Sequence, residues 1–215
     1  VYIEIRYRMR DSMKEATSKT SAFFAFLRRL RFIRRWGLMR NMEPENNQEH
    51  SLDVAFIVHN LALLHNLNGG TVDVNRLAVA AMYHDVSEIF TGDMPTPIKY
   101  FHPTLRELYG QVERLAQEKM LRTLPAELQK AYEPYLLGEL DEVETKLLKA
   151  ADTMAAFMKC AIEKKAGNEE FNEAYDSILK KLHAMELPAV EQFLTLYLEP
   201  MSASLDTLNY SSLDE

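Results

Sequence analysis

The sequence is poor in the residues that several common architectures need. Its 215 residues include one cysteine, seven glycines and eight prolines. The single cysteine, Cys160, allows no internal disulfide and no cysteine-only metal site. So few glycines and prolines argue against a β-rich fold with many tight turns, and against Pro-Gly low complexity. Methionine, in contrast, occurs 11 times, and with abundant leucine and alanine it favours helices.

A long hydrophobic run and an excess of positive charge are also missing. The longest apolar stretch, residues 55–67, is interrupted by two histidines and two asparagines, whereas a membrane-spanning helix needs about 20 apolar residues. The formal net charge is −7, which opposes general attraction to nucleic acid. We therefore expect neither a membrane nor a nucleic-acid partner. One cysteine and no recognisable signal peptide favour a cytoplasmic location.

The spacing of apolar residues divides the chain into three parts. Residues 1–19 combine a short alternating stretch with charged residues, which predicts an N-terminal extension. Residues 20–205 repeat apolar positions at steps of three and four, as amphipathic helices do. Residues 206–215 are polar and predict a frayed tail. The fold class predicted for the central part is all-α, with six to eight helices around one core.

Individual helices can be placed within that central part. The first begins near residue 21, and the third begins after Asp73, a good N-cap, and carries His84 and Glu88 down one side. The loop 91–97 is expected to be non-helical because it holds two prolines. The remaining predicted helices cover residues 48–66, 104–123, 126–136, 142–165, 169–185 and 188–205.

Two histidines and two aspartates have surroundings that suit metal ligands. His84 and Asp85 lie in an apolar stretch, where a charged Asp is costly unless it is paired or binds a cation. His50 lies in the first turn of a helix, where the helix dipole disfavours a protonated imidazole. Asp152 lies among apolar and small residues. The alternatives are a buried His–Asp hydrogen bond, an exposed histidine at a helix start, and pairing of Asp152 with Lys149.

Two imidazoles and two carboxylates would form a mixed nitrogen and oxygen site. Such a set suits Mn, Fe, Co, Ni or Zn better than Ca or Mg, which prefer oxygen ligands alone. A divalent ion there could activate a water molecule and polarise a phosphoryl oxygen. Glu88 follows His84 by four residues, which places it on the same helix face. Its carboxylate could orient the water or shuttle its proton.

The order His50, then His84-Asp85, then Asp152 resembles the HD-domain metal-dependent phosphohydrolases. Within them the sequence looks most like the bacterial 5′-deoxynucleotidases of the YfbR type. The resemblance begins near residue 21 and runs into the C-terminal region. Each motif alone is weak, but their shared order is specific. The stretches that carry it are 34–41, 45–46, 49–51, 81–88, 91–101, 147–152 and 159–160.

This resemblance implies an HD-domain helical bundle over residues 20–205 that removes phosphate from deoxyribonucleoside 5′-monophosphates. It implies one divalent ion, cobalt, manganese or another of Ni, Fe, Zn and Cu. Glu88 and Arg35 would be catalytic, because Glu88 would position water and the planar donors of Arg35 grip phosphate. The implied metal ligands are His50, His84, Asp85 and Asp152. The implied substrate-binding residues are Arg35, Trp36, His50, Asp85, Asp93, Met94, Pro95 and Thr96.

Roles within the substrate pocket follow from the same resemblance. Trp36 would pack on the deoxyribose and leave no room for a 2′-hydroxyl, and Asp93 would accept from the sugar 3′-hydroxyl or order water. The family also suggests a homodimer.

Two other functions stay open: another HD activity, such as hydrolysis of cyclic nucleotides or nucleoside triphosphates, and a non-catalytic helical module stabilised by metal. Glu88 favours the hydrolases, since a purely structural metal site needs no such carboxylate.

Overall fold

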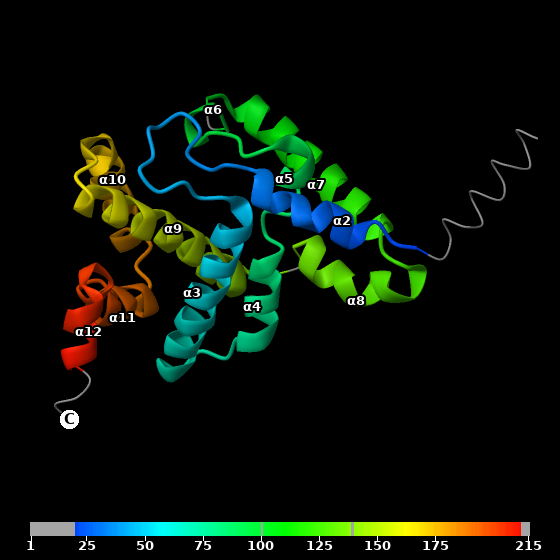
Figure 1. Cartoon of the computed structure of the whole chain (residues 1–215). Coiled ribbons are helices and arrows are strands. Elements are labelled where there is room, and N and C mark those ends of the chain that lie inside the picture. The colour runs from blue at the N-terminus through cyan, green and yellow to red at the C-terminus, as the bar shows by residue number, and fades with distance from the viewer. Residues whose placement is uncertain (1–19, 100, 139, 212–215) are drawn as a thin grey trace, which may run out of the picture.

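The computed structural model describes residues 20–99, 101–138 and 140–211, and within them the structure is helical (Figure 1). The predicted N-terminal extension and the last four residues lie outside the described part. Seven α-helices have nine residues or more, in agreement with the predicted six to eight, and shorter turns connect them. These seven are α3 (Asn47–Leu67), α4 (Val74–Met82), α7 (Pro103–Arg122), α8 (Ala126–Leu136), α9 (Glu142–Lys165), α10 (Asn172–His183) and α11 (Pro188–Tyr197).

The shorter elements differ from the sequence prediction in three places. The first predicted helix is divided into α2 (Phe23–Leu27) and the 3-10 helix η1 (Arg28–Phe32). The predicted final helix is likewise divided, and its last part, α12 (Leu205–Ser211), continues into the predicted polar tail. The loop around residues 91–97 is shorter than predicted, because α6 (Thr96–Lys99) begins inside it. A proline in the first turn costs a helix no hydrogen bond. The remaining short elements are α5 (Glu88–Thr91), η2 (Glu169–Phe171) and η3 (Pro200–Ser202).

Helices α3 and α9 form the centre of the molecule and cross each other (Figure 1). Their facing sides bury the larger hydrophobic cluster, which includes Val58, Leu61, Met154 and Phe157 and extends to α4, α10 and α11. A second, smaller cluster joins α2, α7 and α8 around Phe23. None of the helices in the described part combines the length and hydrophobicity that crossing a bilayer requires.

The start of α3 is fixed by local hydrogen bonds. Asn46 caps the helix by accepting from the backbone N–H groups of Gln48 and Glu49, and the Glu49 side chain accepts from the N–H of Asn46 in return. This reciprocal capping box satisfies donors that the first turn would otherwise leave unpaired. An isolated antiparallel bridge between Arg34 and Asn46 ties the preceding segment to the same point. Residues 33–36 therefore lie beside the first turn of α3.

Candidate metal and phosphate site

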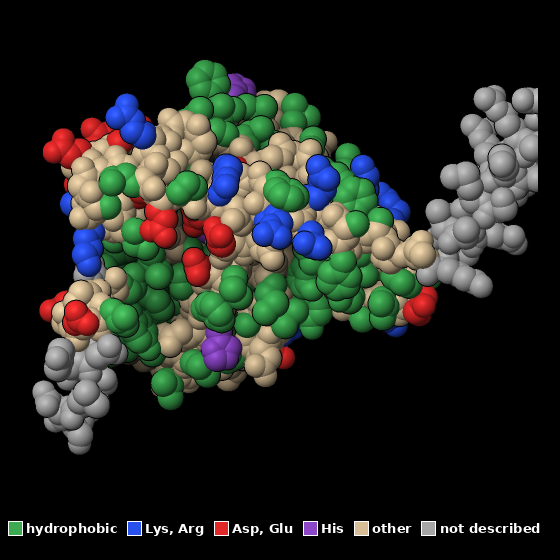
Figure 2. All heavy atoms as spheres, in the orientation of Figure 1, with side chains coloured by type: hydrophobic (Ala, Val, Ile, Leu, Met, Phe, Trp, Pro, Cys, Tyr) green, Lys and Arg blue, Asp and Glu red, His purple; other side chains and the backbone are tan. Residues whose placement is uncertain are grey.

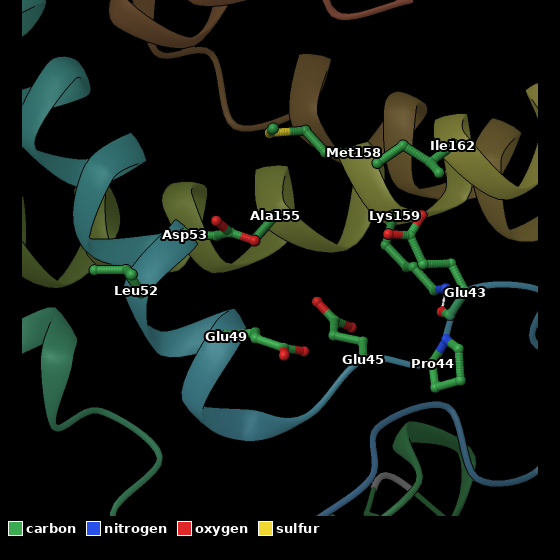
Figure 3. Close-up of a pocket in the computed structure, with 10 residues that line it drawn as sticks. All are labelled: Glu43, Pro44, Glu45, Glu49, Leu52, Asp53, Ala155, Met158, Lys159 and Ile162. Atoms are coloured by element: carbon green, nitrogen blue, oxygen red, sulfur yellow. Dashed lines mark hydrogen bonds between the residues drawn. The ribbon is translucent and has the colours of Figure 1, made fainter. Parts of the chain in front are cut away.

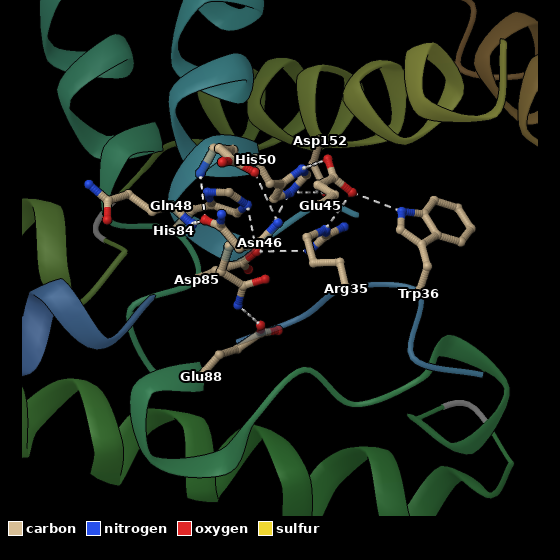
Figure 4. Close-up of polar contacts among 12 residues, drawn as sticks. Arg35, Trp36, Glu45, Asn46, Gln48, His50, His84, Asp85, Glu88 and Asp152 are labelled. Atoms are coloured by element: carbon tan, nitrogen blue, oxygen red, sulfur yellow. Dashed lines mark hydrogen bonds and ion pairs between the residues drawn. The ribbon is translucent and has the colours of Figure 1, made fainter. Parts of the chain in front are cut away.

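Four separate segments bring the candidate residues to one place (Figure 4). His50 projects from the first turn of α3, and its side chain is fully buried, so the exposed-histidine alternative is wrong. His84 and Asp85 come from the turn between α4 and α5. Asp152 comes from α9, and Arg35 from the segment bridged to α3. The site therefore lies where the central helix pair meets the second hydrophobic cluster.

The ligand atoms of three predicted residues converge. One atom each from His50, His84 and Asp85 lies within 4.8 Å of the others. Oδ2 of Asp85 is 3.1 Å from Nε2 of His84 and 3.6 Å from Nε2 of His50. Oδ1 of Asp152 is 3.3 Å from the same nitrogen of His50. Asp152 also accepts from Lys149 through Oδ2 at 2.7 Å. The pairing alternative thus accounts for one oxygen of Asp152, and the other faces the histidine.

The donor set fits a divalent cation. Nε2 of His50 and Nε2 of His84 are buried and have no hydrogen-bond partner within the described residues. Nδ1 of His84 lies 2.8 Å from the carbonyl oxygen of Ala81, which leaves the Nε2 lone pair directed at the carboxylates. A buried polar atom without a partner is unfavourable, and an imidazole held in this way is a typical metal ligand. The two nitrogens and two carboxylates therefore offer what a transition ion requires.

The charges around this site are a second reason to expect a bound cation, besides the chemistry of the ligands. Burial alone would lower the pKa of His84, but the adjacent Asp85 and the nearby Asp152 raise it to about 9. Burial would raise the pKa of Asp85, yet His84, His50 and Arg35 bring it well below its ordinary value. The carboxylates thus stay ionised and attract positive charge. The carboxylates that here favour a proton on His84 would likewise attract a divalent ion.

Arg35 and Trp36 are joined to this cluster by a residue that sequence reasoning did not select, Glu45. Nη1 of Arg35 donates to Oδ2 of Asp85 at 3.4 Å, and its Nε is 3.4 Å from Oε2 of Glu45. The indole Nε1 of Trp36 donates to the same Glu45 oxygen at 2.9 Å. The other oxygen of Glu45 lies 3.8 Å from Nδ1 of His50. One carboxylate therefore orients the guanidinium, the indole and a candidate ligand together.

Glu88 is close to the cluster but not in the predicted way. The helix predicted to carry both His84 and Glu88 ends at Met82, and residues 83–87 form tight turns with bonds from N–H to the carbonyl three residues back. Glu88 then begins the short helix α5. It does not extend the helical face of His84, so that part of the prediction is wrong. Its side chain is buried and accepts a hydrogen bond from Nδ2 of Asn47 instead.

The environment of Glu88 nevertheless suits proton transfer. Burial raises the pKa of its carboxyl to about 8, with a further contribution from the charge of Asp85. A carboxyl whose pKa lies near neutral pH can both hold and release a proton. Asn47, a second residue that sequence reasoning missed, fixes the position of this carboxyl. No local sequence signal predicts this pairing, because Asn47 and Glu88 lie 41 positions apart in the chain.

The predicted sugar-binding loop lies on the same side as Arg35. Asp93 is half-buried, and burial raises the pKa of its carboxyl while the charge of Arg35 opposes that rise. Gly92 adopts a φ of +73°, which lets the chain leave α5 sharply. Met94 and Pro95 are half-buried beside it. The side chain of Thr96 lies outside the described part, so its predicted role is a prediction only.

Among the arginines of the segment before α3, Arg35 is the one that faces the candidate site. The other arginines between residues 28 and 40 are exposed, as a solvated helix face predicts, whereas the Arg35 side chain is 13% exposed and faces the carboxylates. Figure 2 shows several Lys and Arg side chains gathered over the segment of α2 and η1. Those exposed arginines can attract an anion, but Arg35 is the one positioned to grip it.

A pocket of about 300 Å³ lies beside the loop that holds Glu45 (Figure 3). It is lined by the start of α3, by α9 and by the loop that precedes α3, and it shares Glu45 with the candidate site. Acidic side chains surround it, and Figure 2 shows acidic side chains gathered in this region. The lining residues are Glu43, Pro44, Glu45, Glu49, Leu52, Asp53, Ala155, Met158, Lys159 and Ile162.

Beside this pocket, three residues of α9 and the segment after it hold the loop that follows Trp36. We call Lys159, Glu163 and Asn168 the loop anchor. The fully buried carboxylate of Glu163 accepts from the N–H groups of Met42 and Glu43, each at 3.0 Å, and from Lys159 and Asn168. Burial would raise the pKa of Glu163, but these hydrogen bonds lower it from 4.5 to about 2.

The depressed pKa predicts how the loop anchor depends on pH. A carboxylate with a lowered pKa stabilises the fold above its unfolded value, here 4.5, and loses that contribution as pH falls towards 2. The difference is worth about 3 kcal/mol. We expect Glu163→Gln to lower the free energy of unfolding at pH 7, and we expect the gap to wild type to narrow at pH 3. Urea unfolding at both pH values measures this, and a gap that stays constant would contradict it.

Solved structures place this fold in a known class. An HD-domain phosphohydrolase from Listeria innocua is similar, with a TM-score of 0.72 and 29% identity, covering 85% of this chain and 89% of that one. The cyanophage S-2L HD phosphohydrolase DatZ, described as bound to dA and one catalytic Zn²⁺ ion, shares the fold at a TM-score of 0.60 and 21% identity; the match covers 83% of this chain and 95% of that one. The molecule has the fold of the HD-domain phosphohydrolases.

Sequence comparison identifies the family within this class. A 5′-deoxynucleotidase yfbR from Photorhabdus temperata is 46% identical over 191 residues, which cover 88% of this chain and 97% of that protein. The family model for YfbR-like 5′-deoxynucleotidases matches residues 22–201. The chain belongs to the YfbR-like 5′-deoxynucleotidase family.

Proposed function

We propose that the protein is a metal-dependent 5′-deoxynucleotidase, which hydrolyses deoxyribonucleoside 5′-monophosphates to deoxyribonucleosides and phosphate. The observation that carries the proposal is the convergence of His50, His84 and Asp85 within 4.8 Å, next to the guanidinium of Arg35. A relative at 46% identity carries the same activity in its name. Family membership and geometry thus support one reaction.

His50, His84, Asp85 and Asp152 would hold the divalent ion. When bound, such an ion acidifies water and neutralises charge on a phosphoryl group. Cobalt and manganese are our first choices, and the mixed nitrogen and oxygen donor set is compatible with zinc, nickel, iron or copper as well. The Nε2 atoms of both histidines are buried, face these carboxylates and make no hydrogen bond within the described part of the chain, which supports this assignment.

The protein's own residues bind the phosphate and transfer the proton. Arg35 binds the phosphate through its planar donors and is held ready by Asp85 and Glu45. Glu88, positioned by Asn47, takes a proton from the attacking water and can return it to the leaving oxygen. Preorganised charges of this kind stabilise the transition state because they need no reorientation during the reaction.

The sugar would lie between the segment of Trp36 and the loop of Asp93. Trp36 forms the wall that excludes a 2′-hydroxyl, and Asp93 accepts from the 3′-hydroxyl or orders water. Met94, Pro95 and Thr96 complete this side of the pocket, since the loop is stiffened by its prolines. The electrostatic influence of Arg35 on Asp93 supports their placement around one ligand.

A homodimer is part of the same proposal. The outer side of α3 carries an apolar stripe of four residues whose exposed fractions run from 43% to 83%. Figure 2 shows hydrophobic side chains over the lower half of this helix. A stripe of this kind on a 21-residue helix suits contact with a second copy. The stripe residues are Leu52, Phe56, Leu63 and Leu67. The predicted cytoplasmic location stays a prediction.

A substrate panel tests the proposed activity. We expect phosphate release from dAMP and dTMP with added Mn²⁺ or Co²⁺, and none with EDTA, because the carboxylates and imidazoles need the cation to act. Phosphate assay over the panel measures this. Turnover confined to cyclic nucleotides or triphosphates would instead support another HD activity, and turnover of none would support a non-catalytic module. Either result would overturn the proposal.

A further inference from the structure

Trp36 has a backbone conformation that its own chemistry disfavours. Its φ is +58°, in the left-handed region that residues with a large side chain rarely adopt. Such a conformation persists only where the surroundings over-determine it. Around Trp36, the indole packs on Phe171 with ring centroids 5.3 Å apart, and its Nε1 donates to Glu45. Its carbonyl oxygen accepts from the backbone of Met39 and the side chain of Asn41.

The residues after Trp36 are also bound by α9 and by the segment that follows it. Asn168 donates to the carbonyl oxygen of Arg40 at 2.7 Å and to Glu163 at 2.8 Å. Glu163 holds the N–H groups of Met42 and Glu43. Lys159 donates to the carbonyl oxygen of Glu43, as Figure 3 shows, and lies over the ring of Phe171 at 5.6 Å. The loop anchor therefore supports both the loop and the ring on which the indole packs.

One helix thus connects the candidate metal site to the indole. Helix α9 carries Asp152 and, three turns further, Glu163. At about 1.5 Å per residue, these two positions are about 16 Å apart along a rigid rod. Together with Glu45, which accepts from the indole, α9 and the loop anchor therefore set the distance from the metal ligands to Trp36. A loop without such support would let the indole shift relative to the phosphate.

We propose that Lys159, Glu163 and Asn168 are positioning residues that fix Trp36 against the sugar and thereby set the discrimination between deoxyribose and ribose. This inference rests on the proposed nucleotidase function. None of the three touches the candidate ligands or the phosphate site among the described contacts. Their effect on catalysis would pass through the place of the indole, which distinguishes them from the residues that act on the phosphate.

The test compares Glu163→Gln with a matched control, Glu144→Gln. Glu144 is also buried on α9 and also ion-paired, with Arg76 at 2.6 Å, but its bonds run to α4 and to the start of α9. Both variants lose a buried charge pair, but Glu144→Gln leaves the loop anchor intact. Asn168→Ala is a milder second variant, because it removes the bonds to Arg40 and Glu163 but leaves Glu163 paired with Lys159. It replaces Glu163→Gln if that variant fails to fold.

The first readout is independent of activity. Trp36 is the single tryptophan of the sequence, so emission excited at a wavelength that tyrosine does not absorb reports on its surroundings alone. We expect red-shifted emission and stronger acrylamide quenching in Glu163→Gln and Asn168→Ala, and wild-type emission in Glu144→Gln, with far-UV circular dichroism unchanged in all three. Wild-type emission from folded Glu163→Gln and Asn168→Ala would overturn the positioning role.

The second readout concerns specificity. For the pair dAMP and AMP, which differ in the 2′-hydroxyl alone, we expect the ratio of kcat/KM values to fall at least about tenfold in Glu163→Gln, because misplacement of a binding group weakens orientation. The ratio should stay at the wild-type value in Glu144→Gln. Equal losses for both substrates would assign the anchor to stability and overturn the inference. If the wild-type protein hydrolyses neither, the proposed function fails and the specificity role with it, while emission still tests the anchor.

Discussion

Replacing Glu88 with glutamine is expected to lower kcat by about 10²- to 10⁴-fold, the range typical for loss of a general base. Glutamine has the size of glutamate and can still accept the hydrogen bond from Asn47, so the side chain should stay in place. What it cannot do is take the proton of the attacking water. KM and metal content should therefore stay near their wild-type values. Steady-state kinetics on dAMP and elemental analysis measure these quantities.

Glu49→Gln is the matched control for this change. Glu49 is also a glutamate at the start of the site's helices, but it is exposed and serves the N-terminal cap of α3. Glutamine is an accepted partner in a capping box, so folding and kcat should both be retained. An unchanged kcat in Glu88→Gln would remove that carboxyl from the mechanism, whatever the pKa of about 8 suggests.

Asp152→Ala is expected to abolish metal retention. The carboxylate is 3.3 Å from Nε2 of His50 and is the contribution of α9 to the cluster. Without it, the histidines and Asp85 would hold the ion from one side. We expect the affinity to fall by more than about 100-fold, beyond the loss typical for an outer-shell partner. Elemental analysis after dialysis against metal-free buffer measures this, and turnover should be lost in parallel.

Lys149→Met separates the metal role of Asp152 from its ion pair. Lys149 donates to Oδ2 of Asp152 at 2.7 Å, and its own side chain is about half exposed. If Asp152 is a ligand, removing Lys149 should leave metal content close to wild type. Full metal content in Asp152→Ala would disprove the ligand role. Loss of metal in Lys149→Met would mean that metal binding depends on the ion pair between Lys149 and Asp152.

Much of the helical fold could be predicted from the sequence. Helices α8 and α9 have the predicted bounds, and Asp73 caps α4 as its position before an apolar segment indicates. Local rules were sufficient there because capping and apolar periodicity act within a few residues. The rules failed after Met82, where the periodic pattern continues but the helix ends in turns. Packing of Val86 in the second cluster accompanies that break, and no local pattern signals it.

The candidate ligands were also within reach of the sequence, since polar residues in apolar surroundings are unusual enough to be noticed. Their partners were not. Glu45 and Asn47 lie in a polar stretch that reads as an ordinary loop and helix start, and Glu163 lies in a charged run near the end of α9. Folding buries Asn47 and Glu163 beside groups far away in the chain, and it places Glu45 half-buried between Trp36 and His50.

Most of the long helices, the lack of an internal disulfide and the kinds of candidate metal ligand could be predicted from the sequence, because composition, periodicity and the cost of burying charge are properties of short segments. The tertiary structure sets which carboxylate faces which nitrogen, where Arg35 points, and how Trp36 is held in a left-handed conformation. Those choices depend on the crossing of α3 and α9, which brings residues about a hundred positions apart into contact, and no segment of either helix specifies that crossing alone.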